Sequence, residues 1–309
     1  MMLKIANHPI YTYALPQGHR FPMVKYELLP KVLLESSICT PDNFFKPQRV
    51  APSLILKVHG KAYYNKLVSL SLDSKEIRKI GFPLRQELVD RSHYIIGGTI
   101  EGCEFALQNG VGMNIAGGTH HAFKDHGEAF CLLNDQAIAA HYLLDSKKSS
   151  KILIIDLDVH QGNGTAMLFK DNPNVFTFSI HGAKNYPFKK QRSDLDIGLE
   201  NDTQDALYLE ILKNTLPKLV TKVKPDFIFY LSGVDILGSD KLGKLGCTLE
   251  GCMQRDLFVF ESCKQAKIPV QVSMGGGYSK DIDVILKAHT NTYKAAQEVF
   301  FNRNFRSFL

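Results

Sequence analysis

The sequence lacks the features that mark membrane-spanning, secreted and disulfide-bonded proteins. No apolar run approaches the roughly eighteen residues that a membrane span needs. Residues 1–22 also lack the apolar core and cleavage site of a signal peptide. The six cysteines include no Cys-x-x-Cys pair, so neither a disulfide framework nor a thiolate zinc site is indicated. We therefore expect a cytoplasmic protein with free thiols and no membrane span.

A strong excess of charge of either sign is absent as well. The formal net charge is +6, and basic residues are interspersed with acidic ones, so no direct nucleic-acid binding is predicted. Internal repeats, low-complexity segments and linkers are missing too. With 44% hydrophobic residues, the chain can fill one large core, and we predict a single domain over residues 1–309. The composition indicates no particular oligomeric state.

Apolar runs and helical patterns alternate from about residue 110 to the end of the chain. The predicted strands are 152–155, 175–181, 226–231 and 268–274, and the predicted helices are 134–144, 203–223, 248–267 and 281–301. This alternation is typical of an α/β fold with a mostly parallel central sheet and helices on both faces. Earlier in the chain, residues 54–58 predict a strand and residues 90–108 a helix, and the polar segment 182–202 predicts a loop.

The most informative stretch is residues 151–164, with the sequence KILIIDLDVHQGNG. Residues 152–155 are mostly β-branched, as in a strand buried on both faces. If the extended conformation continues, Asp156, Asp158 and His160 leave the same face of the strand. Two carboxylates and an imidazole crowded there need a cation or tight hydrogen bonds to offset their desolvation. A metal ion is the simplest explanation, and two helix-capping aspartates beside a core histidine are the structural alternative.

Two later predicted strands also end in residues that can take part in catalysis. Asp235 follows one of them, and Tyr278 follows another behind three glycines. A catalytic zinc site uses about three protein ligands and keeps one position open for water. Asp158, His160 and Asp235 could supply those ligands, and their oxygen and nitrogen donors favour zinc while remaining compatible with iron, cobalt or manganese.

Tandem histidines follow a Gly-Gly pair at the end of a further strand-like segment. His120 and His121 could transfer protons for metal-activated water, and Tyr278 could donate its phenol hydrogen to a developing oxyanion. Taken singly, a histidine doublet is more often an accident of loop sequence, and a tyrosine after glycines is more often a capping aromatic. Their joint placement at strand ends predicts a hydrolytic site.

These motifs together resemble the zinc-dependent histone deacetylase family. The resemblance is carried by residues 119–135 (THHAFKDHGEAFCLLND), 156–164 (DLDVHQGNG), 231–243 (LSGVDILGSDKLG) and 273–278 (SMGGGY). The HQGNG segment and the region after Asp235 are most similar to class IV members and their bacterial relatives. The resemblance spans residues from about 54 to the C-terminus and weakens over 182–199.

The resemblance implies an arginase/deacetylase α/β fold that forms one catalytic domain over residues 1–309. It implies hydrolysis of an acyl amide on a lysine-like amine in a protein or peptide. The implied roles are zinc ligation by Asp158, His160 and Asp235, general acid–base catalysis by His121 with His120 as its electrostatic partner, and carbonyl polarisation by Tyr278.

Two further features are implied by the resemblance. A structural potassium ion is expected near Asp156, Asp158, His160, Ser179 and Ile180. The acyl-lysine tunnel is expected to have Phe130 as one wall, with Tyr186 or Phe188 as the opposite wall.

Asn163 stands where class I members of the family have an aspartate beside the second histidine. An amide cannot raise the pKa of a histidine as a carboxylate would, so Asp156 should hold one histidine protonated while the other stays nearer neutral. We predict that His121 is the neutral one and takes the proton of water.

Three other functions are compatible with parts of these motifs. Acetylpolyamine deacetylases of the same fold place a glutamate where Leu242 stands, and an apolar side chain offers a second ammonium no partner. An arginase-like dinuclear manganese site would need extra carboxylates beside Asp235, which is preceded by Gly233 and Val234. An inactive zinc-binding module would be expected to have lost a ligand, a histidine or the tyrosine.

The motifs do not determine which acyl group the enzyme removes. The class IV resemblance suggests long-chain fatty acyl groups rather than acetyl, and these would require an apolar cavity beyond the metal. Candidate lining residues are Phe21, Met23, Phe130 and residues 182–188.

Overall fold

The computed structural model describes residues 2–302 and has at its centre one parallel sheet. Over the described residues the sheet has eight strands in the order β2-β1-β3-β8-β7-β4-β5-β6, and every pairing is parallel. The strands are β1 (Lys4–Ala6), β2 (Phe44–Phe45), β3 (Val111–Asn114), β4 (Ile152–Asp156), β5 (Val175–Gly182), β6 (Leu195–Leu199), β7 (Phe227–Leu231) and β8 (Val270–Ser273). The predicted α/β fold is confirmed.

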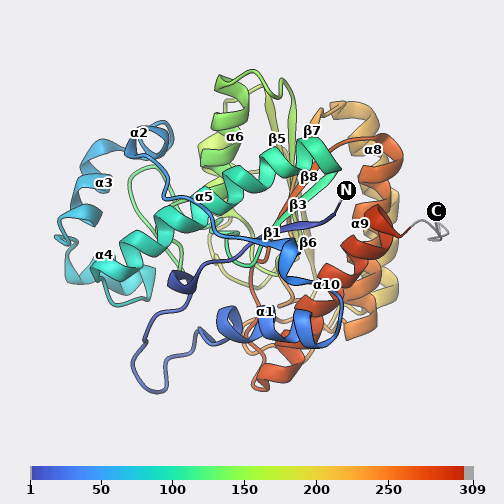
Figure 1. Ribbon diagram of the computed structural model, residues 1–309, viewed down its shortest axis with the longest axis horizontal. Helices are drawn as coiled ribbons and strands as arrows, with labels where there is room; N and C mark the ends of the chain where they lie inside the picture. The colour runs from blue at the N-terminus through green and yellow to red at the C-terminus, as the bar shows by residue number, and fades with distance from the viewer. Residues whose placement is uncertain (1, 303–309) are drawn as a thin grey trace.

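Helices cover both faces of this sheet, as Figure 1 shows. The α-helices are α1 (Lys25–Glu35), α2 (Pro52–Ile55), α3 (Lys61–Val68), α4 (Ser74–Ile80), α5 (Gln86–Asn109), α6 (Asp135–Asp145), α7 (Asn163–Phe169), α8 (Asp205–Val223), α9 (Leu249–Ala266) and α10 (Ile282–Phe301). Helices α5 and α6 pack together on one side of the sheet, whereas α8, α9 and α10 form a continuous layer on the other. None of the described helices has the length and apolarity needed to cross a membrane.

The register of the central strands brings their carboxyl ends together. Asp156, the last residue of β4, lies opposite Ser179 of β5 and Leu231 of β7. Leu231 in turn lies opposite Ser273, the last residue of β8. Because open parallel sheets bind ligands beyond the carboxyl ends of their strands, the loops after β4, β7 and β8 are where a site is expected.

Residues 54–58 do not form the predicted strand. Pro52 begins the short helix α2, and a turn follows it to Val58. Proline is well suited to the first turn of a helix. In addition, Leu56 is 39% exposed, so this run is not covered on both faces as a buried strand would be.

The predicted loop over residues 182–202 contains an additional strand. Strand β6 (Leu195–Leu199) pairs with β5 at the edge of the sheet and is mostly half-buried. Asp196 and Gly198 have low strand propensity, so the alternating apolar residues of this segment do not by themselves predict a strand. Edge strands are the strands that such residues occupy most readily.

Candidate active site

Three side chains that can bind a metal ion lie together beyond the ends of β4 and β7. Asp158 and His160 follow β4, Asp235 follows β7, and their ligand atoms all lie within 4.8 Å of one another. His160 Nδ1 is 3.0 Å from Asp158 Oδ1 and 3.1 Å from Asp235 Oδ2. All three residues are buried. Two carboxylates and one imidazole form a donor set that fits zinc or a similar divalent cation.

Burial makes this cluster costly unless a positive charge lies between the carboxylates. Burial and the charge of Asp158 raise the pKa of Asp235 to about 7. Burial would also raise the pKa of Asp158, but the hydrogen bond from His160 and nearby histidine charges hold it well below its usual value. Burial opposes a charged His160, yet its bonds to both carboxylates raise its pKa to about 10. A divalent cation would supply that positive charge in place of the imidazolium proton.

Backbone N–H groups orient the second oxygen of each carboxylate. The N–H of Gly276 donates to Asp158 Oδ2 at 2.8 Å, and the N–H of Val159 donates to Asp235 Oδ1 at 2.9 Å. A Cβ atom on Gly276 would lie 2.0 Å from Asp235 Oδ2. The close approach of this loop therefore requires glycine, and the hydrogen bonds fix the carboxylates as outer partners of metal ligands do.

The tandem histidines lie beside the cluster, and each has a different partner. His120 Nδ1 is 2.7 Å from Asp156 Oδ2, and His121 Nδ1 is 2.6 Å from Asn163 Oδ1. Their ring centroids are 4.1 Å apart. Both residues are buried.

Asp156 therefore does not share a face with the two residues that follow it, which corrects the sequence prediction. The extended conformation ends at Asp156, and its Oδ1 accepts the N–H of Asp158 in a turn. The turn directs Asp156 towards His120, while Asp158 and His160 face Asp235. Since a side-chain hydrogen bond to the backbone two residues on favours a turn over a strand, the aspartate itself ends the strand.

The two histidines have opposite pKa shifts. Burial opposes protonation of His120, but the charge and hydrogen bond of Asp156 outweigh it and raise the pKa of His120. Burial, followed by the charges of His120 and His160, lowers the pKa of His121 well below its usual value. The amide of Asn163 offsets this only weakly, because it accepts a hydrogen bond without carrying charge. The two shifts have the directions expected for a charged His120 and a neutral His121, whose roles stay a prediction.

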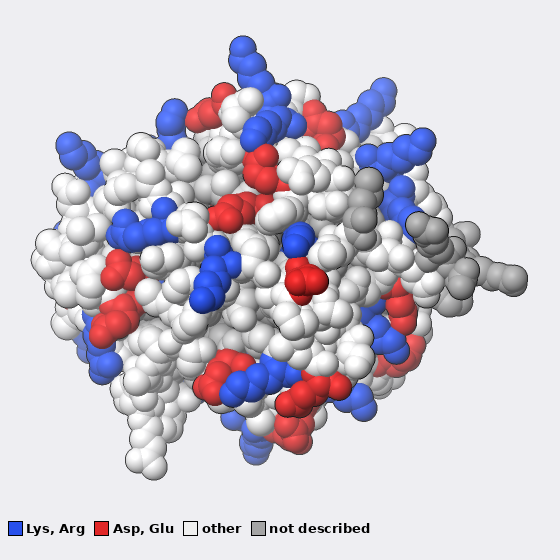
Figure 2. Space-filling model, viewed as in Figure 1, with Lys and Arg blue, Asp and Glu red and all other residues white. Residues whose placement is uncertain are grey.

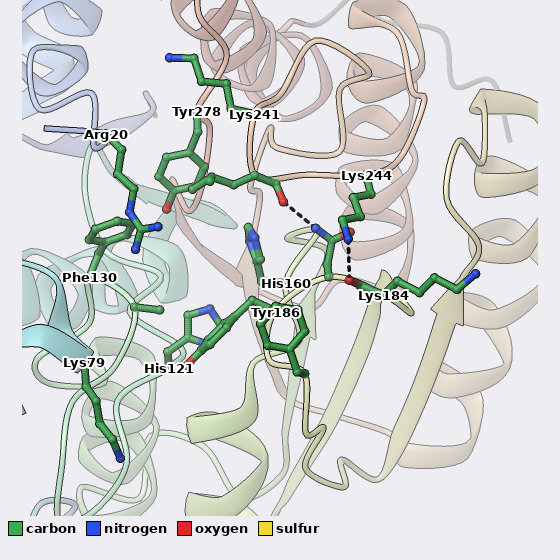
Figure 3. Close-up of a pocket in the computed structure, with 14 residues that line it drawn as sticks. Arg20, Lys79, His121, Phe130, His160, Lys184, Tyr186, Lys241, Lys244 and Tyr278 are labelled. Carbon is green, nitrogen blue, oxygen red and sulfur yellow. Dashed lines mark hydrogen bonds between the residues drawn. The ribbon is translucent and has the colours of Figure 1, made fainter. Parts of the chain in front are cut away.

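A cavity of about 330 Å³ leads from the surface to the cluster (Figure 3). His121, His160 and Tyr278 lie in its inner part, and Phe130 and Tyr186 line opposite sides. The ring of Tyr186 makes a T-shaped contact with His121, at 5.0 Å between centroids. Burial, followed by the charges of the two metal-site carboxylates, raises the pKa of Tyr278 well above its usual value. Tyr278 is therefore a phenol and can act as a hydrogen-bond donor.

Both candidates for the second tunnel wall line this cavity, at different depths. Tyr186 is half-buried beside His121, whereas Phe188 is 88% exposed. A smaller cavity of about 40 Å³ lies deeper, between the metal-site residues and Phe21. The lining of the two cavities includes Phe130, Phe21 and residues 184, 185, 186 and 188 but not Met23, which is buried elsewhere in the core.

The residues expected near a potassium ion are neighbours across β4 and β5. Ser179 lies opposite Asp156 in the register, and Ile180 follows it. The Oγ of Ser179 hydrogen-bonds with His181 Nδ1 at 2.9 Å. The position of Asp156 beside Ser179 and Ile180 is compatible with a cation site, and the potassium ion itself stays a prediction.

Sequence reasoning missed two acidic residues that hold the site in place. Glu128 Oε2 accepts the hydroxyl of Tyr186 at 2.5 Å. Asp240 accepts the backbone N–H groups of Tyr278, Leu242 and Gly243 at 2.6, 2.8 and 2.9 Å. Both residues lie inside the motif stretches, but a sequence does not reveal which distant backbone a carboxylate will contact.

The fold and the site define a class of protein. It is a parallel α/β protein that gathers a carboxylate–imidazole cluster, a histidine pair and a tyrosine at the carboxyl ends of its strands. The family model described as "Histone deacetylase domain" matches residues 19–293. The chain therefore belongs to the histone deacetylase family, a family of amide hydrolases.

Known relatives agree with this assignment. An uncharacterized protein of Picosynechococcus sp. is 42% identical over 97% of this chain and 100% of its own length. Histone deacetylase 2 of Arabidopsis thaliana is 28% identical over 89% of this chain and 73% of its own. A crystal structure of an HDAC homolog complexed with SAHA has a TM-score of 0.82 at 23% identity, and the match covers 100% of this chain and 91% of that chain. This last likeness supports the fold.

Proposed function

We propose that this protein is a metal-dependent hydrolase that removes an acyl group from lysine side chains in proteins or peptides. The observation that carries the proposal is the cluster of Asp158, His160 and Asp235 at the end of a cavity walled by Phe130 and Tyr186. An aromatic-walled cavity with a few convergent polar groups suits the alkyl chain and terminal amide of an acyl-lysine. In this proposal the chain acts as one class IV-like catalytic domain, and its cytoplasmic location stays a prediction.

The residues of the cluster would hold zinc, for which iron or cobalt could substitute. A cation held there supplies Lewis-acid chemistry: it makes water a stronger nucleophile and polarises the acyl carbonyl. A structural potassium ion beside Asp156, Ser179 and Ile180 belongs to the same proposal, and it rests on the resemblance and on the pairing of β4 with β5.

His121 is the proposed general base. Asn163 Oδ1 accepts the Nδ1 proton of His121, which leaves Nε2 as the basic atom, and the lowered pKa keeps the ring neutral. After accepting the proton of water, His121 can pass it to the leaving amine. His120, protonated beside Asp156, provides positive charge near the developing oxyanion, and the phenol of Tyr278 donates a hydrogen bond to that oxyanion.

The inner cavity favours a short acyl group. Its volume of about 40 Å³ is far smaller than the volume of about 330 Å³ of the outer cavity. A preference for long-chain fatty acyl groups, suggested by the class IV resemblance, stays a prediction that finds no support in this volume. We propose acetyl, or a group of similar size, as the preferred acyl group.

Hydrolysis of a matched series of acetyl-, octanoyl- and myristoyl-lysine peptides tests this function. We expect the zinc-loaded protein to cleave the acetyl peptide fastest, because the inner cavity is small, and a chelator to abolish cleavage. Tyr278→Phe is the matched control. It retains the ring but removes the phenol hydroxyl, so kcat should fall by roughly 10²–10³ with the metal still bound.

Other outcomes would contradict particular parts of the proposal. Faster cleavage of the myristoyl peptide would restore the long-chain prediction. Cleavage confined to acetylspermidine would favour a polyamine deacetylase, despite the apolar Leu242 in the cavity lining. A protein that binds zinc but cleaves no substrate would be a binding module.

A further inference from the structure

The mouth of the active-site cavity is surrounded by cationic side chains that the proposed chemistry does not use. We call Arg20, Lys79, Lys184, Lys241 and Lys244 the basic rim. All five line the cavity, and no aspartate or glutamate is among its lining residues over the described chain. Figure 3 shows them at the periphery of the view around the inner histidines and Tyr278.

The basic rim is assembled from separate parts of the chain. Arg20 precedes α1, Lys79 lies in α4, Lys184 follows β5, and Lys241 and Lys244 lie in the loop after β7. The face drawn in Figure 2, by contrast, has basic and acidic side chains interspersed. Side chains of one sign around a concave entrance reinforce one another's field at that entrance, where the low-dielectric walls focus it.

Internal partners neutralise only part of this charge. The Nζ of Lys184 is 3.0 Å from Glu200 Oε2, and the Nζ of Lys79 is 3.8 Å from Glu128 Oε1. Within residues 2–302, Arg20, Lys241 and Lys244 have no carboxylate within ion-pair distance. Lys244 Nζ donates to the backbone carbonyl of Lys184 at 3.2 Å, and the guanidinium of Arg20 lies 5.0 Å from the ring centroid of Phe130. Neither partner carries a negative charge, so the positive charge of these three side chains is not neutralised and can attract an anionic ligand at the entrance.

The acyl-lysine itself does not account for this charge. Its amide is neutral, and it would sit below the rim, between Phe130 and Tyr186. The parts of a substrate that reach the basic rim are the residues on either side of the acylated lysine. Phe188, which is 88% exposed at the same entrance, adds an apolar surface for those residues.

We propose that the basic rim selects protein or peptide substrates in which acidic residues flank the acyl-lysine. The inference rests on the proposed deacylase function and names its substrate class. Carboxylates beside the acylated lysine would approach Arg20, Lys241 and Lys244, whereas a polycationic substrate such as an acylated polyamine would be repelled.

Three acetyl-lysine peptides with glutamate, glutamine or arginine at the flanking positions test the proposal. The quantity compared is kcat/KM for the zinc-loaded protein at low and at high salt. We expect the glutamate peptide to exceed the arginine peptide by roughly tenfold at low salt, because several weak surface interactions add up. The difference should shrink at high salt, since exposed charges are screened.

Charge-reversal variants locate the effect. The double variant Lys241→Glu/Lys244→Glu should abolish or reverse the ratio of kcat/KM between the glutamate and arginine peptides. Lys213→Glu is the matched control, because Lys213 is exposed on α8 and does not line the cavity, so the ratio should be unchanged. Melting temperatures of both variants check that they are folded.

Failure of this inference can be distinguished from failure of the proposed function. If capped acetyl-lysine is hydrolysed but the three peptides have equal kcat/KM, the enzyme is a deacylase and the basic rim is not a specificity surface. If capped acetyl-lysine is not hydrolysed, the deacylase proposal fails. Fluorescence anisotropy with labelled glutamate and arginine peptides then tests the rim alone, and equal affinities would overturn it.

Discussion

At the scale of single residues, the choice of His121 as the proposed proton acceptor depends on one amide oxygen. His120 and His121 are adjacent in the chain and both are buried, yet one is paired with a carboxylate and the other with an amide. The pKa of His120 is raised and that of His121 is lowered. Two identical side chains thereby have pKa values shifted in opposite directions, a pattern that marks separate acid and base roles at catalytic sites.

Asn163→Asp should move the pH dependence of catalysis in a defined direction. A carboxylate 2.6 Å from His121 Nδ1 would raise the pKa of His121, by about 1 to 3 units for a neighbouring opposite charge. A base works only when deprotonated, so the acid limb of kcat/KM should move to higher pH. The pH–rate profile measures this, with exposed Asn201→Asp as a control. An unmoved acid limb would mean that His121 does not accept the proton.

At the scale of elements, loops that follow different strands are tied together by a single carboxylate. Asp240 belongs to the loop after β7, and Tyr278 to the loop after β8. The hydrogen bond from the Tyr278 N–H to Asp240, together with those from Leu242 and Gly243, fixes one loop against the other. Asp240 touches no reacting atom in the proposed chemistry, and we regard it as a positioning residue for Tyr278.

Asp240→Asn should lower kcat more than it raises KM. The amide keeps only one of the two acceptor oxygens. It therefore cannot accept all three backbone N–H groups, and the loop of Tyr278 is displaced. A displacement on the order of 1 Å can cost about a hundredfold in rate. Steady-state kinetics and metal content measured together test this. Asp171→Asn, at an exposed position, is the matched control. A variant with a lower melting temperature but normal kcat would give Asp240 a purely structural role.

At the scale of the whole molecule, the proposed metal joins the two central strands β4 and β7. The cluster lies at the carboxyl ends of these strands and is buried. A cation that binds the folded chain but not the unfolded one stabilises the fold by mass action. Stability and the integrity of the site are therefore coupled.

Chelation should lower the melting temperature of the zinc-loaded protein. A site occupied at about a thousand times its Kd contributes roughly 4 kcal/mol, which corresponds to roughly 6 °C for a domain of this size. Gly276→Ala should not show this response, because its Cβ would fall 2.0 Å from Asp235 Oδ2 and disturb the cluster. Gly60→Ala, whose Cβ would meet only an ordinary contact of 3.6 Å, is the control. Calorimetry with and without chelator measures the shift, and an unchanged wild-type melting temperature would contradict it.

The sequence alone determined the fold class and the three residues of the candidate metal cluster. Apolar runs such as residues 152–155 predict buried strands because only a sheet covered on both faces excludes water from every side chain. The alternation of strands with helices then predicts a parallel sheet, and such a sheet brings its strand ends to one edge. Local patterns were sufficient to predict that Asp158, His160 and Asp235 lie close together, and the structure brings them together.

Only the tertiary structure decided which partners those residues have. The turn at Asp156, the hydrogen bond of Asp240 to Tyr278 and the edge strand β6 depend on contacts between segments far apart in the chain. The basic rim depends on such contacts as well, since its members come from separate loops and helices. The physical reason is that side-chain direction and local charge are set by packing, and packing between distant segments has no periodic signal in the sequence.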